Sequence, residues 1–239
     1  MAPRSDRGEV AGAPGGPGSP GAEEVSPLTL NRLSFYLRCL RHLQELGIKR
    51  VSSQELAQRY HLSATQIRKD LAQFGEFGIR GVGYEVDELA EHLNELLGLD
   101  HEHRMILVGM GNLGTALAQY LGFNYGAFRV VAGVDNDPEK VGRQVGELIV
   151  RHTSELVEVV RESGAQIGVL AVPAEAAQEN YDALADAGIG GVINFAPVRV
   201  RRRPDVPLKN VDLRINLEEL AFFLKAERGA VKSASSGRS

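Results

Sequence analysis

The chain has 239 residues, of which 43% are hydrophobic, and a formal net charge of −4 at neutral pH. This composition suits one or two soluble globular domains. It contains no run of about 18 apolar residues, and its N-terminus lacks the basic-then-apolar order of a secretory signal, so we expect a cytoplasmic protein. The single cysteine, Cys39, cannot form an internal disulfide. Its apolar helical setting predicts a core residue, with a thiol redox switch as the alternative.

The first 26 residues differ in character from the rest of the chain. They are rich in Gly, Pro, Ala and charged residues, and they show no apolar periodicity. Such a segment cannot bury enough apolar surface to offset the entropy lost on ordering. We therefore expect residues 1–26 to form a disordered extension.

Three short helices are predicted next. Leucines recur at spacings of three and four between Pro27 and Gly47, which is typical of an amphipathic helix with a glycine stop. A second helix is expected to end at Tyr60, and a third to run to about Phe74. The expected N-caps are Ser52 or Ser53 for the second helix and Ser63 for the third.

Two short helices separated by a tight turn are typical of a helix-turn-helix, and the third helix carries suitable polar residues. Residues 75–84 come next as a glycine-rich hairpin, which fits the wing of a winged helix. Residues 27–85 hold nine Lys and Arg against five Asp and Glu, a net charge of +4, so this part is the basic one. A solvated helical bundle is the alternative. The candidate DNA-binding residues are Ser63, Thr65, Gln66, Arg68, Lys69 and Arg80, the last for a minor groove.

The segment from Arg104 to Asp135 has the order of a dinucleotide site: an apolar strand, a glycine turn, a helix and a second strand ending in an acid. The helix N-terminus provides an anion site for the pyrophosphate. Asp135 can accept hydrogen bonds from ribose hydroxyls, and no Arg follows it, which favours NAD(H) over NADP(H). A glycine turn in a nucleotide-free domain is the alternative. The candidate residues are Gly109, Met110, Gly111, Asn112, Leu113, Gly114 and Asp135.

Strands and helices alternate beyond Asp135, which predicts a parallel sheet covered by helices on both faces. Strands are expected over residues 167–172 and 191–195. Because ligands bind outside the carboxyl ends of such strands, the residues that end them are candidate cofactor contacts, or else ordinary strand stops. These residues are Val172, Pro173, Asn194 and Phe195.

Two other clusters of polar residues invite a functional interpretation. His101 and His103 lie close in sequence, but no third ligand is nearby, so we expect surface residues and no metal site. Four arginines between residues 199 and 203 are expected to form a solvated loop, with a phosphate contact as the alternative. An aromatic-rich helix over residues 216–225 has more apolar residues than an exposed edge helix carries, which favours packing in its own domain or in a dimer.

Several motifs together resemble the redox-sensing transcriptional repressor Rex family of bacteria, over about residues 27–225. The motifs are Ile67-Arg68-Lys69-Asp70-Leu71, Phe74-Gly75, Arg80-Gly81-Val82-Gly83-Tyr84, Gly109-Met110-Gly111-Asn112-Leu113-Gly114, Asp135 with Asp137-Pro138-Glu139-Lys140-Val141-Gly142, Val172-Pro173, and Asn194-Phe195-Ala196-Pro197.

The resemblance implies an α/β protein with an N-terminal winged helix-turn-helix, a Rossmann-type parallel sheet and a domain-swapped C-terminal helix. It implies a homodimer that binds palindromic double-stranded operator DNA, holds NADH or NAD+, and is released by NADH. The family's nicotinamide-sensing network matches Arg38, Tyr120 and Asp212. Relatives place a Phe beside that Asp, whereas this chain has Leu213, so an apolar contact replaces aromatic stacking.

We therefore expect a regulator with no catalytic residues. The expected parts are a disordered extension (1–26), a winged helix (27–86), a connecting helix and junction (87–103), a Rossmann domain (104–215), a swapped helix (216–227) and a disordered tail (228–239). One alternative is an NAD-dependent oxidoreductase with an accessory helix-turn-helix, although no acid or base stands out beside the expected nicotinamide. A CoA-binding domain is another, but it does not explain the basic N-terminal module.

Overall fold

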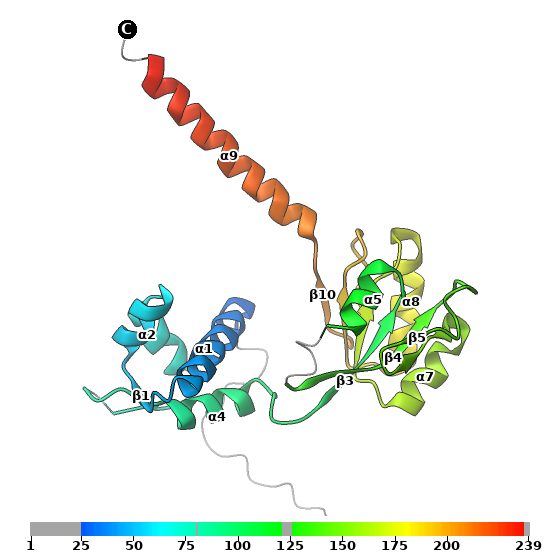
Figure 1. Ribbon diagram of the computed structural model, residues 1–239, viewed down its shortest axis with the longest axis horizontal. Helices are drawn as coiled ribbons and strands as arrows, with labels where there is room; N and C mark the ends of the chain where they lie inside the picture. Colours follow the sequence, from blue (N-terminus) through cyan, green and yellow to red (C-terminus); the bar gives the residue numbers. More distant parts are fainter. Residues whose placement is uncertain (1–24, 80, 121–125, 237–239) are drawn as a thin grey trace, which may run out of the picture. The chain divides into compact units, whose positions relative to one another are not determined.

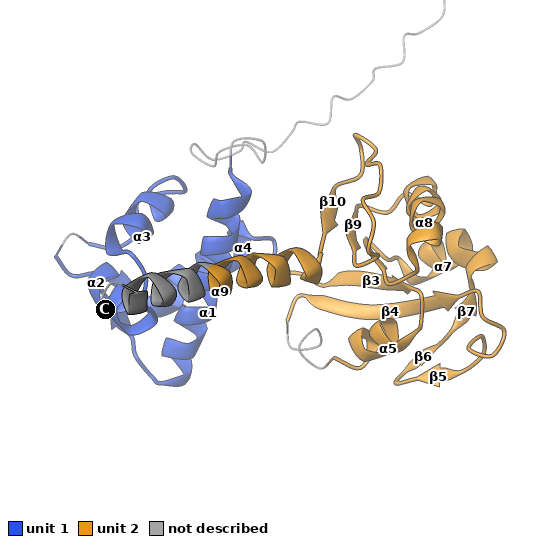
Figure 2. Cartoon of the chain, turned by 90° about the horizontal axis from the view of Figure 1, so that it is seen from above, with its two compact units in different colours: residues 1–100 blue, residues 101–239 orange. Residues whose placement is uncertain are grey.

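The computed structural model describes residues 25–79, 81–120 and 126–236, and side chains only as far as residue 225. Most of the predicted disordered extension, and Arg80 in the predicted wing, lie outside the described residues. The chain divides into two compact units, residues 1–100 and 101–239 (Figure 2). Within the described part of the chain, no helix is long and apolar enough to cross a membrane.

Unit 1 is mostly helical, and the N-caps of its first three helices are serines. Ser26 and Ser63 cap α1 and α3, and Ser52 forms a reciprocal capping box with Glu55. The turn between α2 and α3 passes through His61 at φ 54°, a left-handed conformation that ends α2. The elements are α1 (Pro27–Glu45), β1 (Arg50–Val51), α2 (Ser53–Tyr60), α3 (Ala64–Leu71), β2 (Tyr84–Glu85) and α4 (Val86–Leu96).

The helix α4, expected as a connector, is part of the core of unit 1. Its Val86, Leu89 and Leu93 are buried, and α4 packs against α1. The antiparallel pair of β1 and β2 leads directly into it. Because this helix buries its apolar face in unit 1, it belongs to the compact unit that ends at Asp100.

Helix α3 and the segment after it differ in detail from the prediction. The helix ends at Leu71, and tight turns continue from there to Phe74. Further on, Ile79 and Gly83 exchange two backbone hydrogen bonds of 3.0 Å, which closes a tight hairpin. A Cβ on Gly83 would lie 2.6 Å from the carbonyl oxygen of Val51, so only glycine lets the hairpin approach β1.

Unit 2 contains one six-stranded parallel sheet and a small hairpin formed by β5 and β6. The sheet order is β10-β9-β8-β3-β4-β7, so the chain reverses its direction of travel across the sheet at β3. This is the doubly wound order whose crevice lies at the carboxyl ends of β3 and β8. The elements are β3 (His103–Val108), α5 (Asn112–Ala118), β4 (Phe128–Asp135), β5 (Gln144–Val145), β6 (Leu148–Ile149), β7 (Arg151–His152), a 3-10 turn (Thr153–Glu155), α7 (Leu156–Ser163), β8 (Ile167–Leu170), α8 (Ala174–Asp186), β9 (Gly191–Asn194), β10 (Leu208–Asn210) and α9 (Leu213–Ser236).

Strand β3 is buried on both faces, as a central parallel strand should be. Ile106 and Val108 join the cluster under α7 and α8, whereas Met105 and Leu107 join the cluster on the side of α5. Figure 2 shows α5 and α8 on opposite sides of the sheet. Because successive strand residues point to opposite faces, one apolar run supplies both cores.

The last helix is longer than predicted. We expected it to lie within residues 216–227, whereas α9 starts at Leu213 and continues to Ser236, through most of the predicted disordered tail. Gly229 does not end the helix, because an isolated glycine lowers helix stability by only about 1 kcal/mol. Its large apolar residues, including Leu217, Leu220 and Phe223, are 54–69% exposed. In unit 2, α9 therefore extends away from the sheet with its apolar side uncovered (Figure 1).

Candidate functional sites

The three glycines after β3 meet different structural demands. Gly109 has φ 95°, and a Cβ there would lie 2.5 Å from the carbonyl oxygen of Ala171. A Cβ on Gly114 would lie 1.9 Å from the carbonyl oxygen of Gly109, so this glycine lets α5 approach the turn. Gly111 has no neighbour within 4 Å of its missing Cβ. Since Gly111 faces the open cleft, its lack of a side chain keeps space for a ligand rather than for packing.

Asp135, at the end of β4, is 5% exposed and holds this turn in place. Its Oδ2 accepts a 2.7 Å hydrogen bond from the backbone N–H of Met110, and its Oδ1 accepts one of 2.9 Å from that of Asp137. Lys140 lies 3.3 Å from Oδ2 and also pairs with Asp137. Burial lowers the pKa of Lys140, but its bonds to the two carboxylates outweigh this effect and raise the pKa above its usual value.

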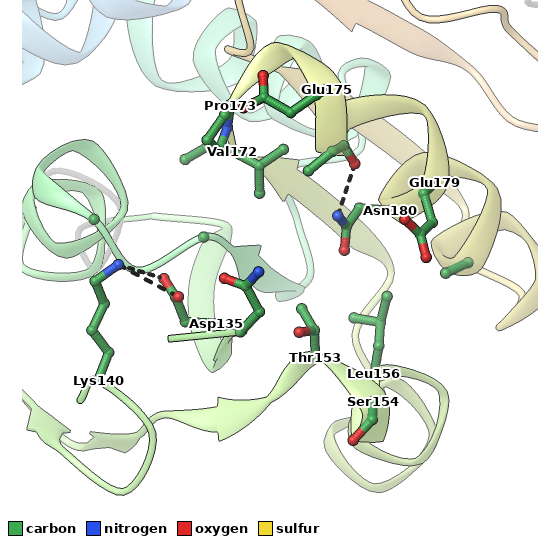
Figure 3. Close-up of a pocket in the computed structure, with 16 residues that line it drawn as sticks. Asp135, Lys140, Thr153, Ser154, Leu156, Val172, Pro173, Glu175, Glu179 and Asn180 are labelled. Atoms are coloured by element: carbon green, nitrogen blue, oxygen red, sulfur yellow. Dashed lines mark hydrogen bonds and ion pairs between the residues drawn. The ribbon is translucent and has the colours of Figure 1, made fainter. Parts of the chain in front are cut away.

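A cleft of about 780 Å³ opens at the carboxyl ends of the strands, in front of the glycine turn (Figure 3). Lys140 points toward Asp135 on one side, and side chains of α8 line the other. The volume is in the range of cofactor sites. The lining residues are Gly109, Gly111, Asp135, Asn136, Lys140, Thr153, Ser154, Leu156, Ala171, Val172, Pro173, Glu175, Ala176, Glu179, Asn180 and Ala183.

Among the candidate cofactor residues, Gly109, Gly111, Asp135, Val172 and Pro173 line the cleft. Met110 and Gly114 are buried beneath the turn, whereas Asn112 and Leu113 are exposed at the start of α5.

Asn194 and Phe195 are not in the lining of the cleft. Asn194 is 1% exposed, and its amide nitrogen donates to Val198 and Asn210. Its Oδ1 accepts from the backbone N–H of Ala196. These bonds tie the loop after β9 to β10, which gives Asn194 a structural role.

Several lining residues were not predicted from the sequence. Lys140 lies in a turn, and Thr153 and Ser154 come after the two-residue strand β7, which has no apolar run to mark it. Glu175, Glu179 and Asn180 share one face of α8. Their helical spacing could have identified these three as lining residues, because the helix was expected to start at the end of a strand.

In unit 1, the candidate DNA-binding residues of α3 are mostly exposed, and several form hydrogen bonds at the N-terminal ends of α2 and α3. Ser63 accepts from the backbone N–H of Gln66, and Arg68 donates to Ser53 over 2.9 Å and to Thr65 over 3.4 Å. Lys69 is exposed. Helix α3 therefore presents two cations and a hydroxyl on its outer side.

Asp70 is the feature of α3 that sequence reasoning missed, because a charged residue between Lys69 and Leu71 looks like a surface residue. It is 0% exposed and forms an ion pair with Arg32 of α1. Tyr36 and Gln66 also donate to it. This cluster fixes α3 on α1.

The residues matched to a sensing network are divided between the two units. Arg38 is exposed on α1 of unit 1, whereas Tyr120 and Asp212 belong to unit 2. Tyr120 is 58% exposed just after α5. The Oδ1 of Asp212 accepts a 2.9 Å bond from the backbone N–H of Arg214, at the start of α9.

The histidine pair and Cys39 are the remaining candidates for metal and thiol chemistry. No group of three or more candidate ligands occurs among the described residues. The rings of His101 and His103 lie 4.6 Å apart, and that of His103 stacks on Phe128. Cys39 is buried, and burial raises the pKa of its thiol to about 11, so the reactive thiolate is disfavoured.

A helix-turn-helix unit joined to a Rossmann unit with an open cleft defines a ligand-responsive DNA-binding regulator. Residues 24–72 match the family described as "Putative DNA-binding protein N-terminus", and residues 100–198 match the one described as "CoA binding domain". The redox-sensing transcriptional repressor Rex of Carboxydothermus hydrogenoformans is 44% identical over 85% of this chain and 98% of its own. Rex 1 of Thermotoga maritima is 45% identical over 84% of this chain and 96% of its own.

Solved structures that are similar to this chain come from the same family as these relatives. A crystal structure of the repressor RSP in complex with β-NAD+ and operator DNA has a TM-score of 0.83 and 36% identity, and covers 87% of this chain and 96% of RSP. The complex of RSP with β-NADH has a TM-score of 0.78 and 34% identity, and covers 87% of this chain and 98% of RSP. The chain belongs to the redox-sensing transcriptional repressor Rex family. Its relatives are transcriptional repressors and not enzymes.

Proposed function

We propose that this protein is a transcriptional repressor that binds palindromic operator DNA as a homodimer and is released by NADH. The observation that carries the proposal is the glycine turn held by Asp135 in a chain whose other unit presents a basic helix-turn-helix. RSP, which has the same two-unit fold, has been crystallised with β-NAD+ and operator DNA, and with β-NADH.

The cleft fits a dinucleotide. Gly111 leaves open space where a pyrophosphate would approach the backbone, and the N-terminus of α5 comes directly after it. Asp135 has lone pairs left for ribose hydroxyls, although Met110, Asp137 and Lys140 already donate to it. We assign the phosphates to the turn Gly109–Gly114 and the nicotinamide side to Val172 and Pro173, with Asn194 and Phe195 supporting the loop behind them. The bound cofactor would supply the redox signal as the charge of its nicotinamide ring.

The basic side of α3 fits DNA. Arg68 and Lys69 are positioned for phosphates or bases, and the cap of α3 presents Ser63 and Thr65. The hairpin of residues 79–83 would act as a wing, with Arg80 in a minor groove. Two such modules related by a two-fold axis would match the two half-sites of an inverted repeat.

Helix α9 fits a role in dimerisation. Leu213, Leu217, Leu220 and Leu224 recur at spacings of four, three and four, and each is at least 58% exposed. Such spacing forms a continuous apolar stripe along one side of a helix. A stripe of this kind on a helix that extends away from its own sheet is suited to exchange with a second copy.

Arg38, Tyr120 and Asp212 form the proposed sensing network. NAD+ has a positively charged nicotinamide and NADH a neutral one, so a carboxylate such as Asp212 stabilises NAD+ relative to NADH. The two forms would then favour different dimer geometries, only one of which fits DNA. By linkage, NADH must weaken DNA binding by the factor by which DNA weakens NADH binding, and a typical coupling of about 1–3 kcal/mol gives roughly 5–150-fold.

The test is operator binding in a titration of NADH at fixed NAD+. The probe is an inverted-repeat duplex selected by the protein from a pool with a randomised centre. Release of DNA as NADH rises supports the proposal, whereas equal binding with and without NADH rejects the switch. A panel of alcohols and hydroxy acids, with NAD+ present, tests the oxidoreductase alternative.

A further inference from the structure

The fully buried carboxylate of Asp70 accepts hydrogen bonds from three side chains, one of which, Gln66, lies on the same helix. Arg32 donates to both of its oxygens, from Nε to Oδ2 over 2.6 Å and from Nη2 to Oδ1 over 2.8 Å. The hydroxyl of Tyr36 donates to Oδ2 over 2.9 Å. One further donor, Nε2 of Gln66, reaches Oδ1 over 2.7 Å. Gln66 is one of the candidate base-contacting residues.

Asp70 is ionised at neutral pH. Burial acts to raise the pKa of this carboxyl, but the hydrogen bonds from Arg32, Gln66 and Tyr36 outweigh it and hold the pKa below its usual value. An ionised carboxylate only accepts hydrogen bonds. The orientation of the Gln66 amide is therefore determined: its NH2 group faces inward and its carbonyl oxygen does not.

This orientation restricts what Gln66 can offer to DNA. An unconstrained glutamine amide can turn either its two N–H groups or its oxygen toward a base. With one N–H given to Asp70, the outward side has the acceptor Oε1 and at most one N–H. The major-groove edge of adenine presents one acceptor and one donor group, whereas that of guanine presents two acceptors. The available groups complement adenine and not guanine.

The carboxylate is itself held firmly. Arg32 also donates to Thr29 over 3.2 Å, and the hydroxyl of Thr29 lies 2.9 Å from that of Ser26, the N-cap of α1. Two helices and one cap thus fix the position of Asp70. Because Gln66 is bonded to this fixed carboxylate, its side chain has less rotamer freedom to lose on binding a base.

We propose that Asp70 is a positioning residue for base recognition, and that it locks Gln66 to select adenine over guanine at one base pair of each half-site. The inference rests on the proposed function, in that α3 must enter a major groove. Asp70 itself would not touch DNA.

The test uses the full-length protein and a pool of short duplexes with a randomised centre, with bound sequences read by sequencing. Wild type is compared with Gln66→Met, which keeps length but removes the amide, and with Asp70→Asn, which keeps shape but removes the charge. Lys69→Ala, on the same helix, is the matched control. Circular dichroism checks the fold, and if Asp70→Asn unfolds, Tyr36→Phe replaces it by removing one bond to the same carboxylate.

We expect wild type to prefer A·T over G·C at one symmetric position by roughly 5–150-fold. Gln66→Met and Asp70→Asn should both lose this preference there and keep the others, with a partial loss in Tyr36→Phe. Lys69→Ala should bind more weakly while keeping the preference at this position. The inference is wrong if Gln66→Met keeps the preference, or if Asp70→Asn keeps it or weakens all positions equally. A wild type that enriches no sequence would instead reject the DNA-binding function itself.

Discussion

The backbone N–H of Met110 donates to Oδ2 of Asp135 over 2.7 Å and joins the glycine turn after β3 to the end of β4. The two residues are 25 positions apart in sequence. Asp135 is therefore an anchor of the turn as well as a candidate ribose acceptor. Its substitution should affect both the shape of the phosphate site and the contact to the ribose.

We predict that Asp135→Asn weakens NADH binding at least about tenfold, because hydrogen bonds to a charged group contribute about 1.5–3 kcal/mol. The variant should also discriminate less against NADPH, since the negative charge that repels a 2′-phosphate is gone while Lys140 remains. Isothermal titration calorimetry with both nucleotides measures this. Unchanged NADH affinity would exclude Asp135 from the site.

Gly111 and Gly114 form a matched pair for separating binding from folding. At Gly111 a Cβ meets no atom within 4 Å, so Gly111→Ala should fold normally but block the approach of a pyrophosphate. At Gly114 a Cβ would lie 1.9 Å from a backbone oxygen, so Gly114→Ala should lower the free energy of unfolding by about 1–3 kcal/mol or more. Thermal unfolding and NADH titration of both variants give the comparison. NADH binding at wild-type affinity by Gly111→Ala would contradict the assignment of the turn.

Much of this site can be predicted from local sequence signals, and the rest depends on distant contacts. The glycine turn and Asp135 were predicted because the glycine spacing, the strand before it and the acid after the next strand all stand in one stretch of sequence. The bond from Met110 to Asp135 was not, since it forms only after β3 and β4 pair in the sheet. Asp70 was missed for the same reason, as its partner Arg32 is 38 residues away.

The ends of the helices and strands also fall into two groups, those set by local sequence and those set by distant contacts. The serine caps and leucine spacing located α1, α2 and α3 closely, because both are local signals. Strand β10 has the sequence Leu-Lys-Asn, which carries no apolar pattern, and it exists because it pairs with β9 at the sheet edge. The extent of α9 could not be predicted either, because Gly229 looks like a stop.

The stability of unit 1 should fall in acid through Asp70. Its pKa is lower in the folded protein than in the unfolded chain, so its contribution is present above the unfolded value of about 4 and is lost as the pH falls through the folded value. Thermal unfolding measured from roughly pH 6 down to roughly pH 2 would show this loss of stability. Asp70→Asn should show a shallower decline than wild type. If the stability of Asp70→Asn fell with pH as steeply as that of wild type, this carboxylate would make no contribution to the acid sensitivity.

Cys39 should not take part in redox sensing. Its thiol is 3% exposed, and its pKa of about 11 keeps it protonated at neutral pH. The thiol should therefore react with a thiol reagent only after unfolding, and Cys39→Ala should keep the response to NADH. Rapid labelling of the native protein would contradict this prediction.

Dimerisation should depend on the apolar stripe of α9. Leu220→Asp places a charge in the middle of the stripe, so we expect monomers and a loss of operator binding. Glu219→Gln, the neighbouring polar position, is the control and should stay dimeric. Light scattering after gel filtration gives the mass of each variant. A dimeric Leu220→Asp would place the interface elsewhere.

The most direct test of the proposed switch is fluorescence anisotropy of the selected operator duplex in a titration of NADH at constant NAD+. We expect the operator to be released as the NADH to NAD+ ratio rises, with apparent DNA affinity falling roughly 5–150-fold. Gly111→Ala should keep the operator bound throughout the same titration. Operator affinity that does not change with the ratio in the wild-type protein would contradict the proposed switch.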